Sequence, residues 1–156
     1  MNDADVLARL SELDIELPPP TTPVAAYVPC VIANGLAFVA GQVPMVDGAV
    51  VSPGHLGDHV TIDEGTAAAR RGAVQALSVL RDALGGFDRL QRITQVTVFV
   101  ASTPDFVDHA TVANGASELL IDALGDAGKH ARAAVGMSSL PLGSSVEVAI
   151  IAAVSA

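Results

Sequence analysis

Two long helical segments, each followed by a β-branched segment, constrain this sequence more than any other feature. Thr61 and Glu64 form a capping box, alanines and leucines then recur at three- and four-residue steps, and the Gly85-Gly86 pair predicts the end of this helix. Residues 93–101 are rich in valine and predict a strand. A cap followed by proline predicts a second helix over residues 102–124, and residues 131–137 and 145–154 predict two closing strands.

The N-terminal third predicts a short helix, an extended linker and a hairpin. Val6, Leu7 and Leu10 share one face of a helix predicted over residues 3–13, and Pro18-Pro19-Pro20 with Pro23 predicts an extended connection. The Asn34-Gly35 turn joins strands predicted over 27–32 and 36–40, and a loop follows to about residue 60. We therefore expect one α+β domain over residues 1–156, of which 1–25 form an N-terminal helix and proline-rich extension.

The order of these elements predicts one sheet with both long helices packed on the same face. No remaining element is available to cover the other face of that sheet. Apolar residues make up 51% of the 156-residue chain and charged residues only 16%, which is a low charged share for a globular protein. Because interfaces between permanent subunits are more apolar than ordinary surface, we expect a homo-oligomer whose subunits cover the exposed face.

Charge and composition exclude several classes of function. The net charge is −9, aromatic residues make up 3% of the chain, and the sequence holds a single lysine, so nucleic acid is not an expected partner. No apolar stretch is long enough to span a membrane. Cys30 is the only cysteine, which excludes an internal disulfide and fits a cytoplasmic, reducing compartment.

Two charges in otherwise apolar strands mark the candidate site. Arg132 lies within Ala131–Gly136, and Glu147 lies within Val146–Ile151. A hairpin of these strands that paired residue 136 with residue 143 would place Arg132 opposite Glu147, so one interpretation is a structural cross-strand ion pair. The other is functional: Arg132 holds a substrate carboxylate with two hydrogen bonds, and Glu147 handles water or protons beside it.

The remaining reactive side chains form no recognisable motif. Tyr27, the only tyrosine, opens the first strand, where a ring partly buried at a sheet edge is the structural expectation. Cys30 is expected to be a buried apolar residue. The four histidines lack the spacing of a metal site, and the glycines form no phosphate-binding loop. The sequence therefore predicts neither a metal nor a cofactor.

From about Tyr27 to Ala153 the chain resembles the Rid/YjgF family, also known as the endoribonuclease L-PSP or translation-initiation-inhibitor family. The resemblance is carried by Ala40-Gly41-Gln42-Val43-Pro44, by Ala131-Arg132-Ala133 with Leu140-Pro141, and by Val146-Glu147-Val148. Asn114-Gly115-Ala116-Ser117 and His130-Ala131-Arg132 are more similar to a YjgF-like subgroup than to RidA itself.

The resemblance implies a chorismate-mutase-like fold, assembled as a homotrimer with ligand clefts between subunits. It also implies a cofactor-free deaminase that hydrolyses 2-imino or enamine acids to 2-keto acids and ammonia. Arg132 would bind the substrate carboxylate, Glu147 would position the attacking water, and Tyr27 and Asn114 would line the cleft. The chain departs from RidA at Ala134, where the family usually has cysteine, and at Ala40, where serine is common.

Two alternatives to the deaminase stay open. The altered surroundings of Arg132 fit a non-catalytic module that binds small carboxylic acids and regulates a partner. The ribonuclease or translation-inhibitor activity in the family's names is disfavoured by the net charge of −9. A chorismate mutase would need more than one well-placed arginine for its dianionic substrate.

Overall fold

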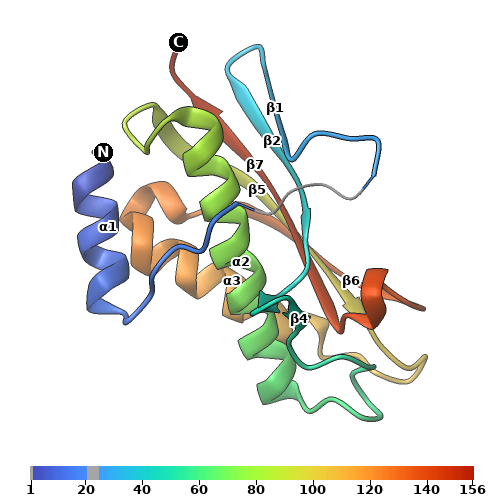
Figure 1. Cartoon of the computed structure of the whole chain (residues 1–156). Helices are drawn as coiled ribbons and strands as arrows, with labels where there is room; N and C mark the ends of the chain where they lie inside the picture. The colour runs from blue at the N-terminus through green and yellow to red at the C-terminus, as the bar shows by residue number, and fades with distance from the viewer. Residues whose placement is uncertain (1, 21–24) are drawn as a thin grey trace.

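The computed structural model describes residues 2–20 and 25–156 and shows an α+β fold with a mixed sheet (Figure 1). The order of its elements is α1 (Asp3–Glu12), β1 (Cys30–Ala33), β2 (Leu36–Gln42), β3 (Met45–Val46), β4 (Ala49–Val50), α2 (Ile62–Leu84), β5 (Leu90–Ala101), α3 (His109–Leu124), the short 3₁₀ turn η1 (Gly125–Gly128), β6 (Ala131–Met137), a second 3₁₀ turn η2 (Pro141–Gly143) and β7 (Val146–Val154). No helix among these described residues is long and apolar enough to cross a membrane.

One five-stranded sheet organises the chain. Its strand order is β1-β2-β7-β5-β6, in which β5 and β6 run parallel and every other neighbouring pair runs antiparallel. Figure 1 shows α2 and α3 side by side on one face of this sheet. The side chains of β7 alternate strictly between fully buried and half-buried positions, with the buried set facing the helices. The expectation of a mixed sheet with both long helices on one face is confirmed.

Local capping and small side chains hold α2 in place. The Thr61 hydroxyl accepts from the Glu64 N–H at 3.2 Å while the Glu64 carboxylate accepts from the Thr61 N–H at 2.8 Å, which is the expected capping box. At the other end Gly85 adopts the left-handed conformation, with φ of 71°. A Cβ on Gly115 of α3 would overlap the carbonyl oxygen of Thr66, so this glycine lets the two helices pack backbone to backbone.

The predicted hairpin of the last two strands is wrong. β5 lies between β6 and β7, and β6 pairs with β5 in the parallel sense, since α3 connects them as a crossover. Arg132 lies beside Val96, which faces the helices, whereas Glu147 lies beside Phe99, which faces the opposite side of the sheet. An Arg132–Glu147 pair within one chain is therefore excluded by the topology.

Two predicted boundaries also shift. The first strand begins at Cys30, so Tyr27 lies before it in a bend, 52% exposed. The second long helix begins at His109, seven residues later than its cap signal at Ser102 indicates. Ser102 donates its N–H to the carbonyl of Met137 and Thr103 donates to that of Leu56, so tertiary hydrogen bonds outcompete the local helix signal.

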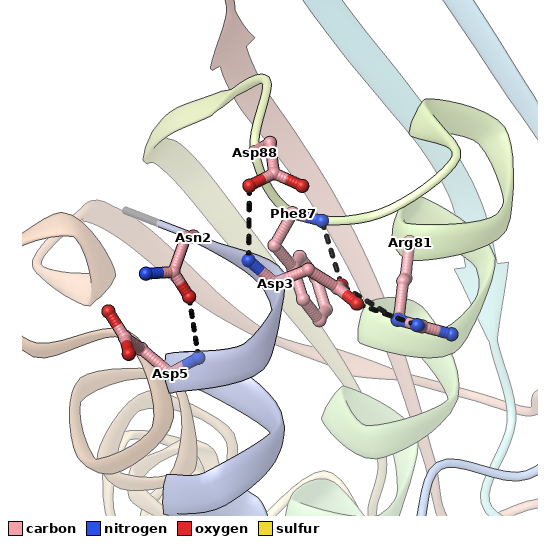
Figure 2. A network of polar contacts seen from close by, with 6 residues as sticks. All are labelled: Asn2, Asp3, Asp5, Arg81, Phe87 and Asp88. Carbon is pink, nitrogen blue, oxygen red and sulfur yellow. Dashed lines mark hydrogen bonds and ion pairs between the residues drawn. The ribbon is translucent and has the colours of Figure 1, made fainter.

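The N-terminal helix is fastened to the end of α2 (Figure 2). The carboxylate of Asp3 accepts two hydrogen bonds from Arg81, at 2.9 and 2.7 Å, and a third from the Phe87 N–H at 3.0 Å. Val6 and Leu10 are buried as α1 packs against α3. The linker then crosses α2, where the Ser78 hydroxyl donates to the Pro18 carbonyl. Pro23, the last residue of the predicted extended connection, lies outside the described residues.

The face of the sheet away from the helices is uncovered by any described element. Its side chains are mostly apolar and partly exposed, among them Val31 at 50%, Phe38 at 41% and Val135 at 40% exposure. Glu147 is the charged residue of β7 on this face. The expectation that one face of the sheet lacks a cover within the chain is confirmed for residues 2–20 and 25–156.

We predict that Asp3→Asn lowers the free energy of unfolding by about 1 kcal/mol at neutral pH, because it weakens a charge-assisted pair that is partly exposed. The hydrogen bonds from Arg81 hold the pKa of Asp3 below its usual value. This stabilisation is therefore complete above the ordinary carboxyl range and is lost as the pH falls through the lowered pKa. Urea unfolding at neutral and acid pH measures the difference, and Asp5→Asn on the same helix is the control.

Candidate active site

Arg132 projects from β6, an edge strand of the sheet, toward the first half of α3. Its Nη1 donates to Asn114 Oδ1 at 2.9 Å and to Ser117 Oγ at 3.1 Å, and its Nη2 donates to the Ala110 carbonyl at 3.2 Å. Asn114 and Ser117 are three residues apart on α3 and so lie on one face of that helix. The guanidinium is thus fixed in orientation by three acceptors from a single helix.

His130 fixes the direction of this hydrogen-bond chain. Its Nδ1 lies 2.5 Å from the Gly128 carbonyl oxygen, which can only accept, so Nδ1 carries the proton. In the neutral ring Nε2 is then an acceptor, and it lies 2.9 Å from Ser117 Oγ. The Ser117 hydroxyl therefore donates to His130 and turns a lone pair toward Arg132. Burial, followed by a smaller contribution from the nearby Arg132 charge, lowers the pKa of His130 and keeps the ring neutral.

Part of the Arg132 guanidinium remains available to a ligand. The three hydrogen bonds leave Nε and one hydrogen of Nη2 without an acceptor in the described part of the chain. In an arginine, Nε–H and one of the two Nη2–H bonds run parallel and form a fork that binds a carboxylate side-on. Arg132 is exposed and forms no ion pair with any described residue. The site therefore presents an uncompensated, oriented positive charge.

Glu147 lies on the other face of the sheet, above a bulge in β2. One extra residue between Val39 and Gln42 shifts the register of β2 against β7. A Cβ on Gly41 would overlap the Glu147 carboxylate, so the glycine of the Gly-Gln-Val-Pro segment leaves room for that group. Burial raises the pKa of Glu147, whose carboxylate has no hydrogen-bond or ion-pair partner among the residues described.

The structure brings some of the expected site residues together and separates others. Arg132 and Asn114 are in contact, and Ala134 is half-buried on the same side of β6 as Arg132. Glu147 lies on the opposite face, and Tyr27 lies beside β1 at the far edge of the sheet. One chain therefore holds an oriented guanidinium on one side of the sheet and, on the other, a carboxylate without a partner among the described residues.

Ser117 and His130 belong to the hydrogen-bond network around Arg132 and were not assigned by sequence reasoning. Both stand in segments that carry the family resemblance, but their contact joins residues 13 positions apart. The available signal was the spacing of Asn114 and Ser117 on one helical face together with a histidine two residues before Arg132. Within the described part of the chain, no three His, Cys, Asp or Glu side chains converge in a way that could hold a metal ion.

Comparison with known proteins identifies the family. Residues 7–154 match the family model described as "YjgF/chorismate mutase-like, putative endoribonuclease". The chain belongs to the YjgF family. The protein TCP17 of Trypanosoma cruzi is 43% identical over 144 residues, which cover 92% of this chain and 90% of TCP17.

Solved structures of relatives share the fold. The Agrobacterium tumefaciens protein Atu1372, whose function is unknown, is 40% identical and superposes with a TM-score of 0.92, covering 98% of this chain and 94% of Atu1372. Escherichia coli TdcF, solved with bound serine, is 20% identical with a TM-score of 0.62 and covers 89% of this chain and 94% of its own. The family resemblance is confirmed, whereas the activity of this YjgF member has to be inferred from its own residues.

We predict that Gly41→Ala lowers the free energy of unfolding by about 1–3 kcal/mol, because the new methyl group forces the Glu147 carboxylate out of its place. The cost falls to well under half of that value in a Glu147→Ala background, where the obstruction is gone. A double-mutant cycle by chemical denaturation measures this coupling. Equal costs in the two backgrounds would show that Gly41 is needed for some other reason.

We predict that His130 makes the free energy of unfolding depend on pH. Because its pKa is lowered in the folded chain, the unfolded chain binds more protons just below the ordinary histidine value. The stability that the neutral ring contributes is therefore complete above about pH 6.5 and decreases as the pH falls toward the lowered pKa. His130→Gln removes this part of the pH dependence, whereas His59→Gln at an exposed position leaves it unchanged.

Proposed function

We propose that this YjgF-family chain is a cofactor-free deaminase that hydrolyses reactive 2-imino or enamine acids to 2-keto acids and ammonia. The observation that carries the proposal is the oriented Arg132 guanidinium, whose Nε has no acceptor among the described residues. A 2-imino acid offers the carboxylate that this edge fits. Asn114 and Ser117 hold the arginine, and Ala134 supplies a small surface beside it.

Glu147 is proposed as the group that handles water. An unpartnered carboxylate with a raised pKa is a competent proton acceptor near neutral pH. Water adds to the iminium carbon as Glu147 takes its proton, and the proton then passes to the nitrogen. The carbon–nitrogen bond breaks and ammonia leaves, while the hydroxyl gives its remaining proton to Glu147 and the carbon–oxygen double bond forms; Glu147 then releases that proton to the solvent or to the ammonia. Every atom of the products comes from the substrate and one water molecule.

The proposal requires more than one copy of the chain, because Arg132 and Glu147 face opposite sides of one sheet. We propose a homotrimer in which the uncovered face of one subunit packs against a neighbour. Arg132 and Asn114 of one copy then line a cleft with Tyr27 or Glu147 of the next. The exposed Phe38 and Val135 on the uncovered face fit such burial. We also propose a cytoplasmic location, with which the single cysteine is consistent.

A regulatory, non-catalytic carboxylate-binding module is the second candidate. It is favoured by Ala134, which stands where cysteine is usual in RidA, while the carboxylate anchor at Arg132 is kept. TdcF, solved with bound serine, shows that a protein of this fold binds a small amino acid. The endoribonuclease named in the family description is disfavoured here by the net charge of −9.

The test is release of ammonia and 2-keto acid from imines that an amino-acid oxidase generates in situ. We predict that Arg132→Ala lowers kcat/KM by about 10- to 150-fold, because a charged hydrogen-bonded anchor is lost. Glu147→Gln abolishes turnover while leaving the affinity for 2-keto acids within a few fold. Arg70→Ala, at a partly exposed arginine of α2, is the control.

The pH profile separates the two candidate functions. In the deaminase, kcat/KM falls as the pH drops through the raised pKa of Glu147, and this acid limb is absent from any residual activity of Glu147→Gln. Binding of 2-keto acids that depends on Arg132, with no acceleration over the spontaneous rate for a broad panel of imines, would establish the binding module instead. RNA cleavage lost in Arg132→Ala would support the ribonuclease.

A further inference from the structure

A second recess, not used by the proposed chemistry, opens where β5 and β6 end. Its volume is about 570 Å³, enough for a ring-sized group. Ser102 Oγ and His109 Nε2 lie 3.1 Å apart in its wall, and His55 closes one side by contacting the Ser138 carbonyl through Nε2 at 2.9 Å. We call this recess the distal pocket.

The distal pocket and the Arg132 anchor flank the same turn of α3. Gly136 lines the pocket and projects from the same side of β6 as Arg132, four residues further along, or about 13 Å at the rise of a strand. His109, in the pocket wall, is followed directly by Ala110, whose carbonyl holds Arg132. Between the two, β6 presents only Ala134 on that side. The anchor and the pocket therefore lie on the same side of β6 and share the first turn of α3.

Ser102 and His109 fill the space beside Gly136 at the pocket wall. A Cβ at this position would lie 2.6 Å from His109 Nε2 and 3.1 Å from Ser102 Oγ. Any larger residue on β6 would therefore displace the pair or fill the pocket. Ala134 and Gly136 are both small, so no large side chain projects from this side of β6 between Arg132 and the pocket.

The lining defines the chemistry of the group that fits. Phe106, Pro104 and Met137 supply an apolar wall, and the Phe106 ring meets the His109 ring edge to face at 5.2 Å. No Asp, Glu, Lys or Arg is among the described residues that line it. The Thr103 hydroxyl, however, has no hydrogen-bond partner in the described chain, and neither do the Nδ1 atoms of its two histidines. An uncharged ring with a hydroxyl group matches both features.

We propose that the distal pocket binds the side chain of the ligand whose carboxylate is held by Arg132, which makes the substrates aromatic, hydroxyl-bearing 2-imino acids. This inference rests on the proposed function, because it takes Arg132 to be the carboxylate anchor. The ring packs against Phe106, and its hydroxyl reaches the Thr103 hydroxyl or a histidine nitrogen. A ligand with a charged far end loses hydration there without gaining a partner.

Calorimetry with four 2-keto acids on the full chain tests the inference. Phenylpyruvate is expected to bind at least about tenfold more tightly than pyruvate because a ring is buried. The hydroxyl of 4-hydroxyphenylpyruvate adds about two- to tenfold more. The charged end of 2-oxoadipate gives no gain over pyruvate. Equal affinity for all four acids would overturn the inference.

Variants tie these gains to the pocket. Thr103→Val, of equal size, is expected to remove the hydroxyl gain and leave phenylpyruvate binding unchanged, whereas Thr111→Val on α3 changes neither. Phe106→Leu reduces the ring gain, and Gly136→Ala reduces it independently should the first variant fold poorly. A ring gain that survives both Phe106→Leu and Gly136→Ala would overturn the inference.

Pyruvate separates this inference from the proposed function. Pyruvate binding that is lost in Arg132→Ala, combined with no gain for the aromatic acids, leaves the proposed function standing and removes only the distal pocket. Absence of binding for every acid, or binding equal in wild type and Arg132→Ala, removes both.

Discussion

The hydrogen bonds that fix the Arg132 guanidinium against α3 are the interaction on which the candidate site depends. The same guanidinium forms no ion pair with a carboxylate of the described residues. Three acceptors from α3 take one end of Arg132, and neutral His130 directs the Ser117 hydroxyl so that it accepts from the arginine. These are neutral acceptors, so they orient the charge without cancelling it. An exposed arginine would otherwise lose side-chain entropy on binding an anion, and here much of that ordering is already complete.

The sheet explains why this charge and Glu147 do not neutralise each other. β5 lies between β6 and β7, and the two groups pair with β5 residues that face opposite sides, Arg132 with Val96 and Glu147 with Phe99, so the sheet separates them. Each is consequently open toward a different side of the molecule. Glu147 lies on the uncovered apolar face, so the face that we expect to pack against a neighbouring subunit also holds this carboxylate. Chemistry that needs both groups then belongs to an assembly of chains.

Local sequence signals predicted most helices and strands well. The features that the sequence missed depend on contacts between distant segments. The capping box at Thr61 and the glycine after Leu84 act within a few residues, so α2 could be placed correctly. The start of α3 could not, because hydrogen bonds from Ser102 to β6 and from Thr103 to the loop before α2 override a local helix signal. The hairpin interpretation failed for a related reason. Spacing alone does not reveal that a third strand enters between two neighbours in sequence.

The same division holds at the candidate site. Arg132 and Asn114 were expected to act together and lie 2.9 Å apart, whereas Ser117 and His130 gain their roles only through a contact between α3 and the segment before β6. The distal pocket was invisible in the sequence because its lining comes from three separate segments, namely the loop before α2, the residues after β5 and the end of β6.

Subunit mixing tests the central claim most directly. Arg132→Ala chains, which keep only the reduced activity expected without the arginine, and inactive Glu147→Gln chains are coexpressed so that their subunits assemble together, and imine hydrolysis is measured on the mixture. If the chain is a trimer in which Arg132 of one copy works with Glu147 of the next, about a quarter of all clefts in a random one-to-one mixture pair two intact groups, and activity returns in that proportion. A mixture of verified mixed trimers that is no more active than its parents would contradict the account.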